Sequence, residues 1–208
     1  LETAPVTVGE RELRTVLPRF MGDRMQLPPM YSAVRIDGRR LYDYARAGET
    51  DVVADRVQPR RVYIRSLDIE LIDFAADSNV KKVTFVVECS KGTYIRTLCD
   101  DIGADLGCYG CMEALLRTRV GPFALEEACR LEEVASALKT GELGKMLCPI
   151  DRLFVEYPAV RVKEGWEKLA YNGNGLKRSM TDGDREIKDG ACVRLYDVGG
   201  NFLALYRY

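Results

Sequence analysis

The chain has 208 residues, 47% of them hydrophobic, which is enough for one sizeable core or for a medium core and a small second domain. No apolar run approaches the length of a membrane span and no basic segment leads into an apolar one at the start, so neither a transmembrane nor a secreted protein is predicted. With 31 Lys and Arg against 32 Asp and Glu, the net charge is −1, so any binding of nucleic acid must depend on local basic patches.

A helix is expected near the start of the chain. Apolar residues recur at helical spacing between positions 6 and 20, Thr7 could cap the first turn, and Gly22 and Asp23 end the run. A surface helix over residues 6–20 is therefore predicted.

A strand, a tight turn and a short helix are expected next. Two prolines at positions 28 and 29 require extended backbone, and residues 30–36 read as a strand that enters a turn at Asp37 and Gly38. Apolar residues at helical spacing over positions 41–45 then predict a short helix that stops at Gly48.

The middle of the chain predicts a hairpin followed by a helix. Alternating apolar and polar residues indicate strands over residues 61–74 and 80–88, with a turn at 77–79. The turn Ser90-Lys91-Gly92-Thr93 opens an amphipathic helix over residues 94–106, which Gly107 ends. A short helix at 112–116, a strand at 120–123 and a helix at 131–138 complete this region.

The character of the sequence changes at about residue 155. Strand 159–162, helix 164–171 and a hairpin over residues 192–206, around Gly199 and Gly200, indicate a small β-rich domain. The expected division is a first domain of residues 1–150 and a second of residues 151–208. The fold class is α+β, with a mixed or antiparallel sheet, flanking helices and a small β-rich C-terminal domain.

Cysteine and histidine usage narrows the chemistry. The seven cysteines are odd in number and scattered, as expected of reduced thiols in a cytoplasmic protein. Cys108 and Cys111 form a C-x-x-C without a second pair at zinc-site spacing, so we interpret them as two small core residues. The chain has 0 His, which excludes histidine-based hydrolase triads and imidazole-bound metals. No metal site is predicted.

Four stretches carry a family resemblance. They read PPMYSAVRIDG at residues 28–38, LYDYAR at 41–46, SKGTYIR at 90–96 and LLRTRVGPF at 115–123. In this order and spacing they resemble the bacterial TruB family of tRNA pseudouridine synthases, and the similarity is dense over residues 25–131. The resemblance implies a pseudouridine synthase-like catalytic domain in residues 1–150.

The resemblance also implies a reaction and a pocket. The family converts a uridine in the T loop of tRNA to pseudouridine without cofactor or metal, using an aspartate that acts at the sugar carbon while the detached uracil turns. Tyr31 and Tyr94 match the two pocket tyrosines, Arg96 matches the arginine that pairs with the catalytic carboxylate, and Leu115 matches an apolar wall of the pocket. Tyr31 and Arg96 are thus the expected catalytic residues, and the substrate-binding residues are Tyr31, Tyr94 and Leu115.

These assignments agree with the chemistry of the side chains. An aromatic ring can stack on a flipped base, which contributes about 1–3 kcal/mol in single-strand recognition. A tyrosine hydroxyl near the sugar or the base can donate or accept a proton. A guanidinium at Arg96 requires an anionic partner if it is buried. The alternative is that the tyrosines fill half-buried positions and that Leu115 is a core residue.

The chain departs from the family pattern in two places. The family has Lys where this chain has Arg35, and its amino-terminal K-P-x-G and G-x-L-D segments, the second of which holds the nucleophilic Asp, have no counterpart before Tyr31. Asp100 and Asp101 match ordinary helical positions of the family, and we reject them as nucleophiles. Because the first residue is Leu, a cut or truncated start is expected, and this chain alone is predicted to be inactive.

Two other functions stay open. The first is a tRNA-binding or tRNA-folding module that has lost its nucleophile. The second is the guide-RNA-dependent branch of the same superfamily, which the bacterial-looking motifs at residues 30–33 and 90–92 disfavour.

The region after residue 155 resembles the small PUA-like RNA-binding domain that ends many bacterial members. The resemblance lies in residues 193–197 and 202–204. It implies contact with tRNA, and the candidate phosphate ligands of the whole chain are Arg35, Lys177, Arg178 and Arg194. For these charges a plain surface role is an equal alternative. The expected partner is the T arm of tRNA, bound by a monomer without a membrane.

Overall fold

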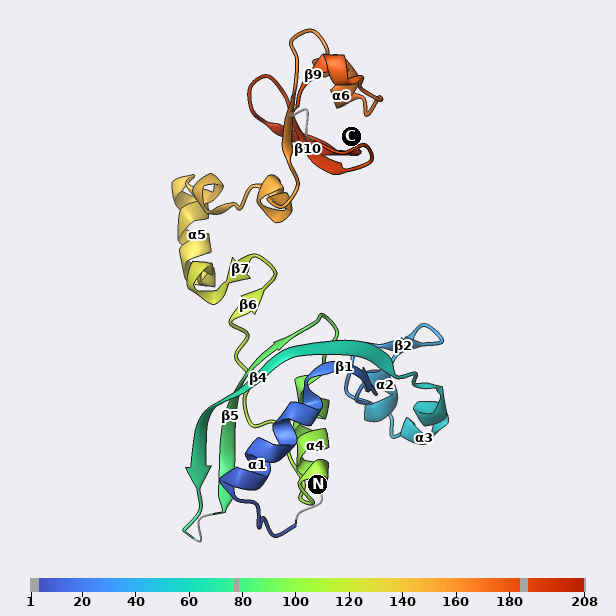
Figure 1. The fold of residues 1–208 in the computed structure, drawn as a ribbon, viewed down its shortest axis with the longest axis vertical. Coiled ribbons are helices and arrows are strands. Elements are labelled where there is room, and N and C mark those ends of the chain that lie inside the picture. The colour runs from blue at the N-terminus through green and yellow to red at the C-terminus, as the bar shows by residue number, and fades with distance from the viewer. Residues whose placement is uncertain (1–3, 77–78, 184–186, 208) are drawn as a thin grey trace. The chain divides into compact units, whose positions relative to one another are not determined.

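The computed structural model describes residues 4–76, 79–183 and 187–207. The chain forms two compact units, Leu1–Leu115 and Leu116–Tyr208, each with its own sheet and core (Figure 1). The combination of helices with largely antiparallel sheets confirms the α+β class.

A three-stranded antiparallel sheet of order β1-β4-β5 forms the first unit's framework. The strands are β1 (Gly22–Gln26), β4 (Arg60–Phe74) and β5 (Val80–Cys89). The long hairpin of β4 and β5 confirms the two predicted strands, whereas β1 was not predicted. Two residues of the predicted turn, 77 and 78, lie outside the described residues.

Two helical segments pack against this sheet (Figure 1). The first consists of α1 (Glu10–Val16) and the 3-10 helix η1 (Leu17–Phe20), and the second is α4 (Ile95–Asp105). Their common core contains Leu13, Phe20, Ile64, Leu98 and Ile102, each at most 4% exposed. The predicted cap at Thr7 is wrong, because the Glu12 carboxylate accepts the Gly9 N–H at 3.1 Å and α1 begins after Gly9.

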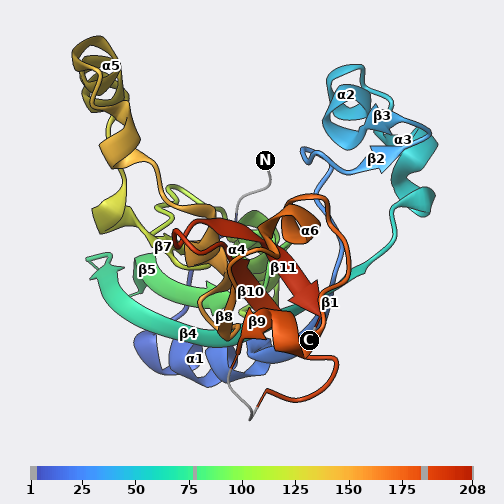
Figure 2. The same ribbon diagram turned by 90° about the horizontal axis from the view of Figure 1, so that it is seen from above.

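A small group of elements is inserted in the chain between β1 and β4. It contains β2 (Arg35–Ile36), β3 (Arg39–Arg40), α2 (Leu41–Arg46), α3 (Thr50–Val53) and the 3-10 helix η2 (Ala54–Arg56). Figure 2 shows the group set apart from the sheet, and it has a separate core of Leu41, Tyr44, Val53 and Val57.

The turn of this insertion is correctly predicted, but its first strand is shorter than expected. Asp37 and Gly38 adopt φ angles of 51° and 78°, which fits a two-residue hairpin turn between β2 and β3. Residues 30–34 do not pair as a strand, so Tyr31 lies in an irregular segment ahead of β2. The prediction of one strand over residues 30–36 is therefore wrong for most of its length.

The segment after α4 is extended, and the helix predicted at residues 112–116 does not form. The reason is a close approach of two backbone segments. A Cβ on Gly103 would lie 2.2 Å from the Gly110 nitrogen, so this segment passes directly over α4 at a point where both residues must be glycine. The Lys82 ammonium on β5 also pairs with the Glu113 carboxylate at 2.7 Å, which holds the extended segment beside the hairpin.

The second unit begins with a short hairpin and a helix. The strands β6 (Arg119–Val120) and β7 (Phe123–Ala124) pair around Gly121, where one strand was predicted. The helix α5 (Leu131–Thr140) confirms the predicted helix and ends at Gly141, whose φ is 75°. In the chain, α5 is preceded by the 3-10 helix η3 (Leu125–Glu127) and followed by the 3-10 helices η4 (Leu143–Met146) and η5 (Ile150–Phe154).

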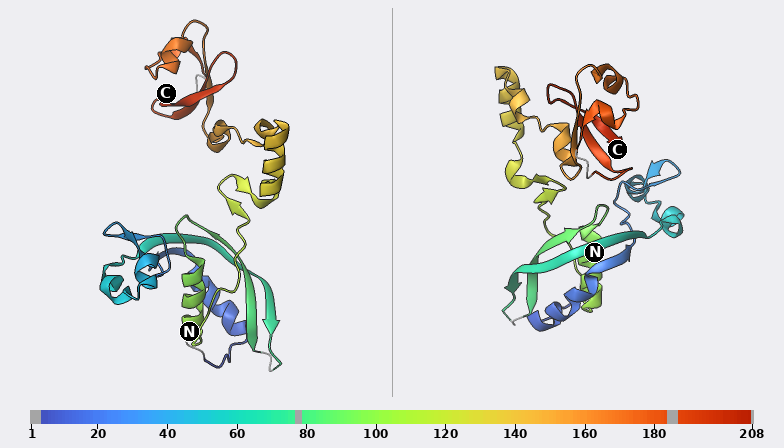
Figure 3. Two further views of the ribbon diagram at one scale, coloured as in Figure 1. Left: turned by 180° about the vertical axis from the view of Figure 1, so that it is seen from behind. Right: turned by 45° about the horizontal axis from the view of Figure 1, so that its top comes forward.

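A four-stranded sheet of order β11-β10-β8-β9 completes the second unit (Figure 3). Its strands are β8 (Ala159–Val162), β9 (Thr181–Asp182), β10 (Cys192–Tyr196) and β11 (Phe202–Arg207), and the predicted hairpin around Gly199 and Gly200 is confirmed. The connecting helices are α6 (Glu167–Tyr171) and the 3-10 helix η6 (Arg178–Met180). The core contains Val160, Val162, Val193 and Leu195.

The residues just before this sheet contact it through stacked rings and a hydrogen bond. The Phe154 ring stacks on Tyr157 and Phe202, and the Tyr196 hydroxyl donates to the Asp151 carboxylate at 2.7 Å. These contacts support a domain that begins at residue 151, which stays a proposal.

Asp197 organises the turn between β10 and β11. Its carboxylate, in a residue 5% exposed, accepts the Asn201 N–H at 2.8 Å, the Asn201 amide at 2.9 Å and the Tyr171 hydroxyl at 2.8 Å. The hydrogen bonds from the side chain and main chain of Asn201, followed by that from Tyr171, lower the pKa of Asp197 from 3.8 to about 2. A carboxyl with a lowered folded-state pKa stabilises the fold above its unfolded pKa, and this stabilisation is lost as the pH falls toward 2.

We therefore expect the second unit to lose stability between about pH 4 and pH 2 through Asp197. The chain has 1 Trp, Trp166, which lies in this unit, so urea unfolding followed by its fluorescence measures the effect. Asp197→Asn should lower the unfolding midpoint at pH 7 and flatten its pH dependence, while Glu164→Gln, at an exposed site, serves as control. An unchanged pH dependence in Asp197→Asn would contradict this role.

Candidate active site

Gln26 joins the end of β1 to the start of α4. Its side chain is in a residue 6% exposed, and its amide donates to the Tyr94 carbonyl at 3.0 Å while its carbonyl accepts the Tyr94 N–H at 2.7 Å. Tyr94 is the N-cap residue of α4, so these two bonds fix the backbone from which both Tyr94 and Arg96 project. This role of Gln26 was not predicted, because β1 lacks an alternating apolar pattern that would indicate a strand.

Arg96 brings two of the distant motifs together. One terminal nitrogen of its guanidinium donates to the Tyr31 main-chain carbonyl at 2.6 Å, across 65 residues of sequence. Arg96 is exposed, and within the described parts of the chain no carboxylate lies within 4.0 Å of its guanidinium. Three of the four predicted pocket residues therefore form one constellation, because the Arg96 side chain bonds to the Tyr31 carbonyl and Tyr94 lies two residues before Arg96.

The two tyrosine side chains remain accessible. Tyr31 is 57% exposed and Tyr94 is half-buried. Among the ring pairs of the described residues the two tyrosines do not stack on each other.

Two buried hydroxyls flank the contact between Arg96 and Tyr31. Ser32 Oγ follows Tyr31, Thr97 Oγ1 follows Arg96, and neither has a hydrogen-bond partner among the described residues. Buried polar groups are nearly always hydrogen-bonded, so unpartnered hydroxyls at a candidate site require an explanation.

Leu115 is not joined to this constellation by a described contact. It is 54% exposed and lies in the extended segment, two residues after Glu113. Its membership of the pocket stays a prediction.

The candidate phosphate ligands differ in their surroundings. The Arg35 guanidinium donates to the Gly38 carbonyl at 2.9 Å within its own hairpin, and Lys177 is exposed. The Arg178 guanidinium pairs with the Asp189 carboxylate. Arg194 is half-buried and donates to the Tyr157 carbonyl at 2.9 Å and the Tyr196 hydroxyl at 3.1 Å, which gives it a structural role.

Asp100 and Asp101 lie on α4 beyond Arg96. Burial raises the pKa of Asp101, an effect that the nearby Arg24 opposes. Asp100 is exposed and four residues after Arg96, so the two share a helix face, yet they form no ion pair within the residues described. Their rejection as nucleophiles stays a prediction.

The C-x-x-C pair is only partly as predicted. Cys108 packs against the first core, but Cys111 is exposed, so the core interpretation is wrong for Cys111. The described residues contain no group of three or more Cys, Asp or Glu that could hold a metal ion. In the same residues, none of the helices is long and apolar enough to cross a membrane.

Two family models match successive parts of the chain. Residues 2–95 match the model of the TruB family pseudouridylate synthase N-terminal domain, and residues 96–155 match that of the tRNA pseudouridylate synthase B C-terminal domain. The chain is 40% identical over 207 residues to a tRNA pseudouridine synthase B of Burkholderia mallei (strain NCTC 10247), covering 100% of this chain and 65% of that protein. A tRNA pseudouridine synthase B of Lachnoclostridium phytofermentans is 40% identical over 188 residues, covering 88% of this chain and 60% of the relative.

Solved structures share the fold. A chain in the crystal structure of a Cbf5-Nop10-Gar1 complex matches with a TM-score of 0.65 and 24% identity, covering 96% of this chain and 55% of that chain. A chain of an H/ACA RNP bound to a substrate RNA matches with a TM-score of 0.65 and 21% identity, covering 99% and 55%. At these identities the likeness shows a shared fold.

The chain belongs to the TruB family of pseudouridine synthases. It spans about 65% of the length of the Burkholderia relative.

Loss of the Gln26 side chain should loosen the start of α4. We expect Gln26→Ala to lower the free energy of unfolding by about 1–3 kcal/mol, because it leaves the Tyr94 N–H without a partner, whereas the Tyr94 carbonyl still accepts the Leu98 N–H at 3.1 Å. Urea unfolding followed by circular dichroism measures this change. Glu70→Ala, at an exposed position of β4, should change it by less than about 0.5 kcal/mol. Equal effects of the two substitutions would contradict the positioning role.

Proposed function

We propose that residues 1–150 carry the base-binding pocket of an enzyme that isomerises a uridine in the T loop of tRNA to pseudouridine, and that the nucleophilic aspartate comes from a segment not among these 208 residues. The observation that carries the proposal is the hydrogen bond from Arg96 to the Tyr31 carbonyl at 2.6 Å. It joins the segment that contains Tyr31 to the helix start that contains Tyr94.

The reaction needs a flipped base. The bond from the sugar to uracil N1 breaks, a bond from the sugar to C5 forms, and the proton lost from C5 is balanced by a proton that N1 gains. A uracil that turns within the site must leave its stack in the RNA and must be held by its faces, which aromatic rings do without preventing rotation. The exposed ring of Tyr31 and the half-buried ring of Tyr94 can do so. Leu115 would supply an apolar wall that excludes water.

Arg96 is suited to orient a carboxylate. Its guanidinium is exposed and holds a main-chain carbonyl through one terminal nitrogen, so its remaining donors are available to an incoming acid. A planar guanidinium pairs with a carboxylate through two parallel bonds, which keeps the acid ionised and fixes its direction. The Tyr31 hydroxyl would assist proton transfer at the base or sugar.

The unpartnered hydroxyls support a site completed by another segment. Ser32 Oγ and Thr97 Oγ1 adjoin Tyr31 and Arg96, and both lack partners among the described residues. A segment carrying the G-x-L-D sequence of the family would lie next to Arg96 and could supply those partners.

The second domain, proposed as residues 151–208, would bind tRNA outside the T loop. Lys177 is exposed and is its best phosphate candidate, whereas Arg178 and Arg194 have partners within the protein. A binding-only tRNA-folding module is the alternative function, and the lack of an ion-paired carboxylate at Arg96 within the described residues favours it for this chain by itself.

The test joins this chain to the amino-terminal segment of a family member that carries G-x-L-D. The joined polypeptide should release tritium from 5-tritiated uridine in a stem-loop RNA that carries the T-loop sequence. It should release much less from a control stem-loop in which an anticodon-loop sequence replaces the T loop. A joined polypeptide that binds the stem-loop without releasing tritium would overturn the isomerase proposal and favour the binding module.

A further inference from the structure

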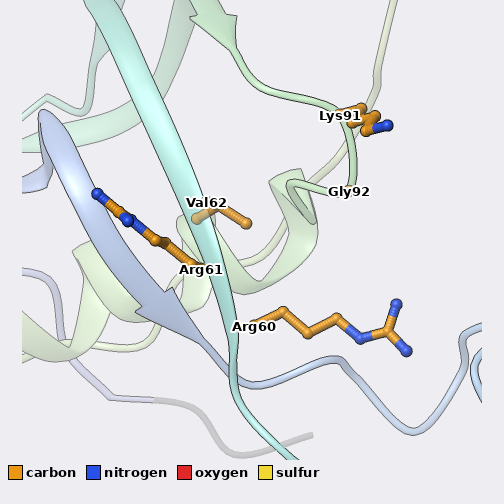
Figure 4. Close-up of a pocket in the computed structure, with 5 residues that line it drawn as sticks. All are labelled: Arg60, Arg61, Val62, Lys91 and Gly92. Carbon is orange, nitrogen blue, oxygen red and sulfur yellow. The ribbon is translucent and has the colours of Figure 1, made fainter.

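A basic hollow lies between the start of β4 and the turn that precedes α4. It has a volume of about 320 Å³ and is lined by Arg60, Arg61, Val62, Lys91 and Gly92 (Figure 4). Since liquid water occupies about 30 Å³ per molecule, the hollow has room for a group much larger than one water. Three of its five lining residues are cations.

The cations in this hollow are not all neutralised by the protein. The Arg61 guanidinium pairs with the Asp23 carboxylate, Nε to Oδ1 at 2.8 Å, which lowers the pKa of Asp23. Arg60 and Lys91 are both exposed and, within the described parts of the chain, neither lies within 4.0 Å of a carboxylate. The hollow therefore carries excess positive charge and can accept an anion.

The hollow adjoins the candidate active site through a chain of contacts. Arg60 is the direct cross-strand partner of Gln26, the residue whose amide holds the Tyr94 backbone. Lys91 precedes Tyr94 by three residues, which span at most about 10 Å. An anion held by Arg60 and Lys91 would thus lie within about one or two nucleotides of a base stacked on Tyr94.

We propose that this hollow is a phosphate site, in which Arg60 and Lys91 bind one backbone phosphate of the RNA strand next to the flipped uridine. The inference rests on the proposed function for its choice of ligand. The Arg60 guanidinium and the Lys91 ammonium line the same hollow, and both groups suit the charge and the multiple acceptors of a phosphate. Anchoring the strand beside the flipped nucleotide would fix its register without reading its sequence.

The first measurement is the affinity of the 208-residue chain for a T-loop stem-loop at several salt concentrations. Arg60→Ala and Lys91→Ala should each weaken binding about 5- to 10-fold and lower the slope of log affinity against log salt by about one. The control is Lys81→Ala, which removes an exposed cation at the other end of β5. Arg60→Lys keeps the charge and should restore most of the affinity, which separates a phosphate role from a loss of folding.

The second measurement replaces single phosphates of the stem-loop by neutral methylphosphonates. Neutralising one linkage beside the target uridine should weaken binding the most. Arg60→Ala should bind this modified RNA no more weakly than the unchanged protein does. Equal sensitivity of all linkages, or an effect of Arg60→Ala no larger than that of Lys81→Ala, would overturn the proposal.

These outcomes can be told apart from a failure of the proposed function. If the joined polypeptide does not isomerise uridine but the sensitive linkage persists, the phosphate site stands and the enzyme proposal fails. If the joined polypeptide isomerises uridine but Arg60→Ala does not change its affinity for the RNA, the phosphate site is wrong and the proposed enzyme function stands.

Discussion

Arg96→Lys in the joined polypeptide is expected to lower the single-turnover rate of uridine isomerisation by about 100-fold, because a nucleophile misplaced by about 1 Å loses a factor of that size. Lysine keeps the charge but cannot hold the Tyr31 carbonyl and a carboxylate in one plane. RNA affinity should change by less than about 3-fold, since the proposed partner of Arg96 belongs to the protein and not to the RNA.

Rapid-quench tritium release and filter binding measure the rate and the affinity separately. Arg11→Lys, at an exposed position of α1, is the matched control and should change neither. A variant that loses RNA binding but keeps its single-turnover rate would show that Arg96 contacts phosphate, which would contradict its proposed role at the active site.

The 208-residue chain alone is expected to form no detectable pseudouridine while still binding a T-loop stem-loop. No described carboxylate lies within ion-pair distance of Arg96, and the proposed nucleophile belongs to a segment outside these residues. The assay is tritium release from 5-tritiated uridine over many hours at excess protein. Tyr94→Ala should weaken binding, because stacking on one aromatic ring contributes about 1–3 kcal/mol.

Turnover by this chain would contradict the proposed origin of the nucleophile. Asp100→Asn and Asp101→Asn would then identify the acid, since both lie on α4 beyond Arg96. Loss of turnover in one of these variants would place the nucleophile on α4.

Elements with strong local patterns were predictable from the sequence. The hairpin of β4 and β5 follows from alternation, and α4 follows from its apolar spacing and from Gly107, whose φ is 73°. β1 escaped prediction because its sequence, GDRMQ, has no apolar alternation and forms a strand only by pairing with β4. Residues 112–116 have helix-forming side chains, yet the close approach of Gly110 to α4 and the ion pair of Glu113 with Lys82 hold this segment in a non-helical path.

The resemblance proposes the residues of the candidate site, but the sequence did not predict the contacts between them. Tyr31, Tyr94 and Arg96 stay predicted pocket residues, and the bond between Arg96 and Tyr31 ends on a main-chain carbonyl, which residue identity does not reveal. Gln26 was missed for a similar reason, because its two bonds to the Tyr94 backbone exist only once β1 and α4 are adjacent. Arg60 and Lys91 look like ordinary surface charges until the fold encloses a hollow between them.

The position of the target uracil in a crystal structure of this chain with a T-loop stem-loop is the most direct test. The expected result is a flipped uracil whose ring centroid lies about 4.5–7 Å from that of Tyr94 or Tyr31, with its sugar facing the Arg96 guanidinium. A uracil that stays stacked in the loop, or RNA that contacts only the second unit around Lys177, would contradict the assignment of this pocket.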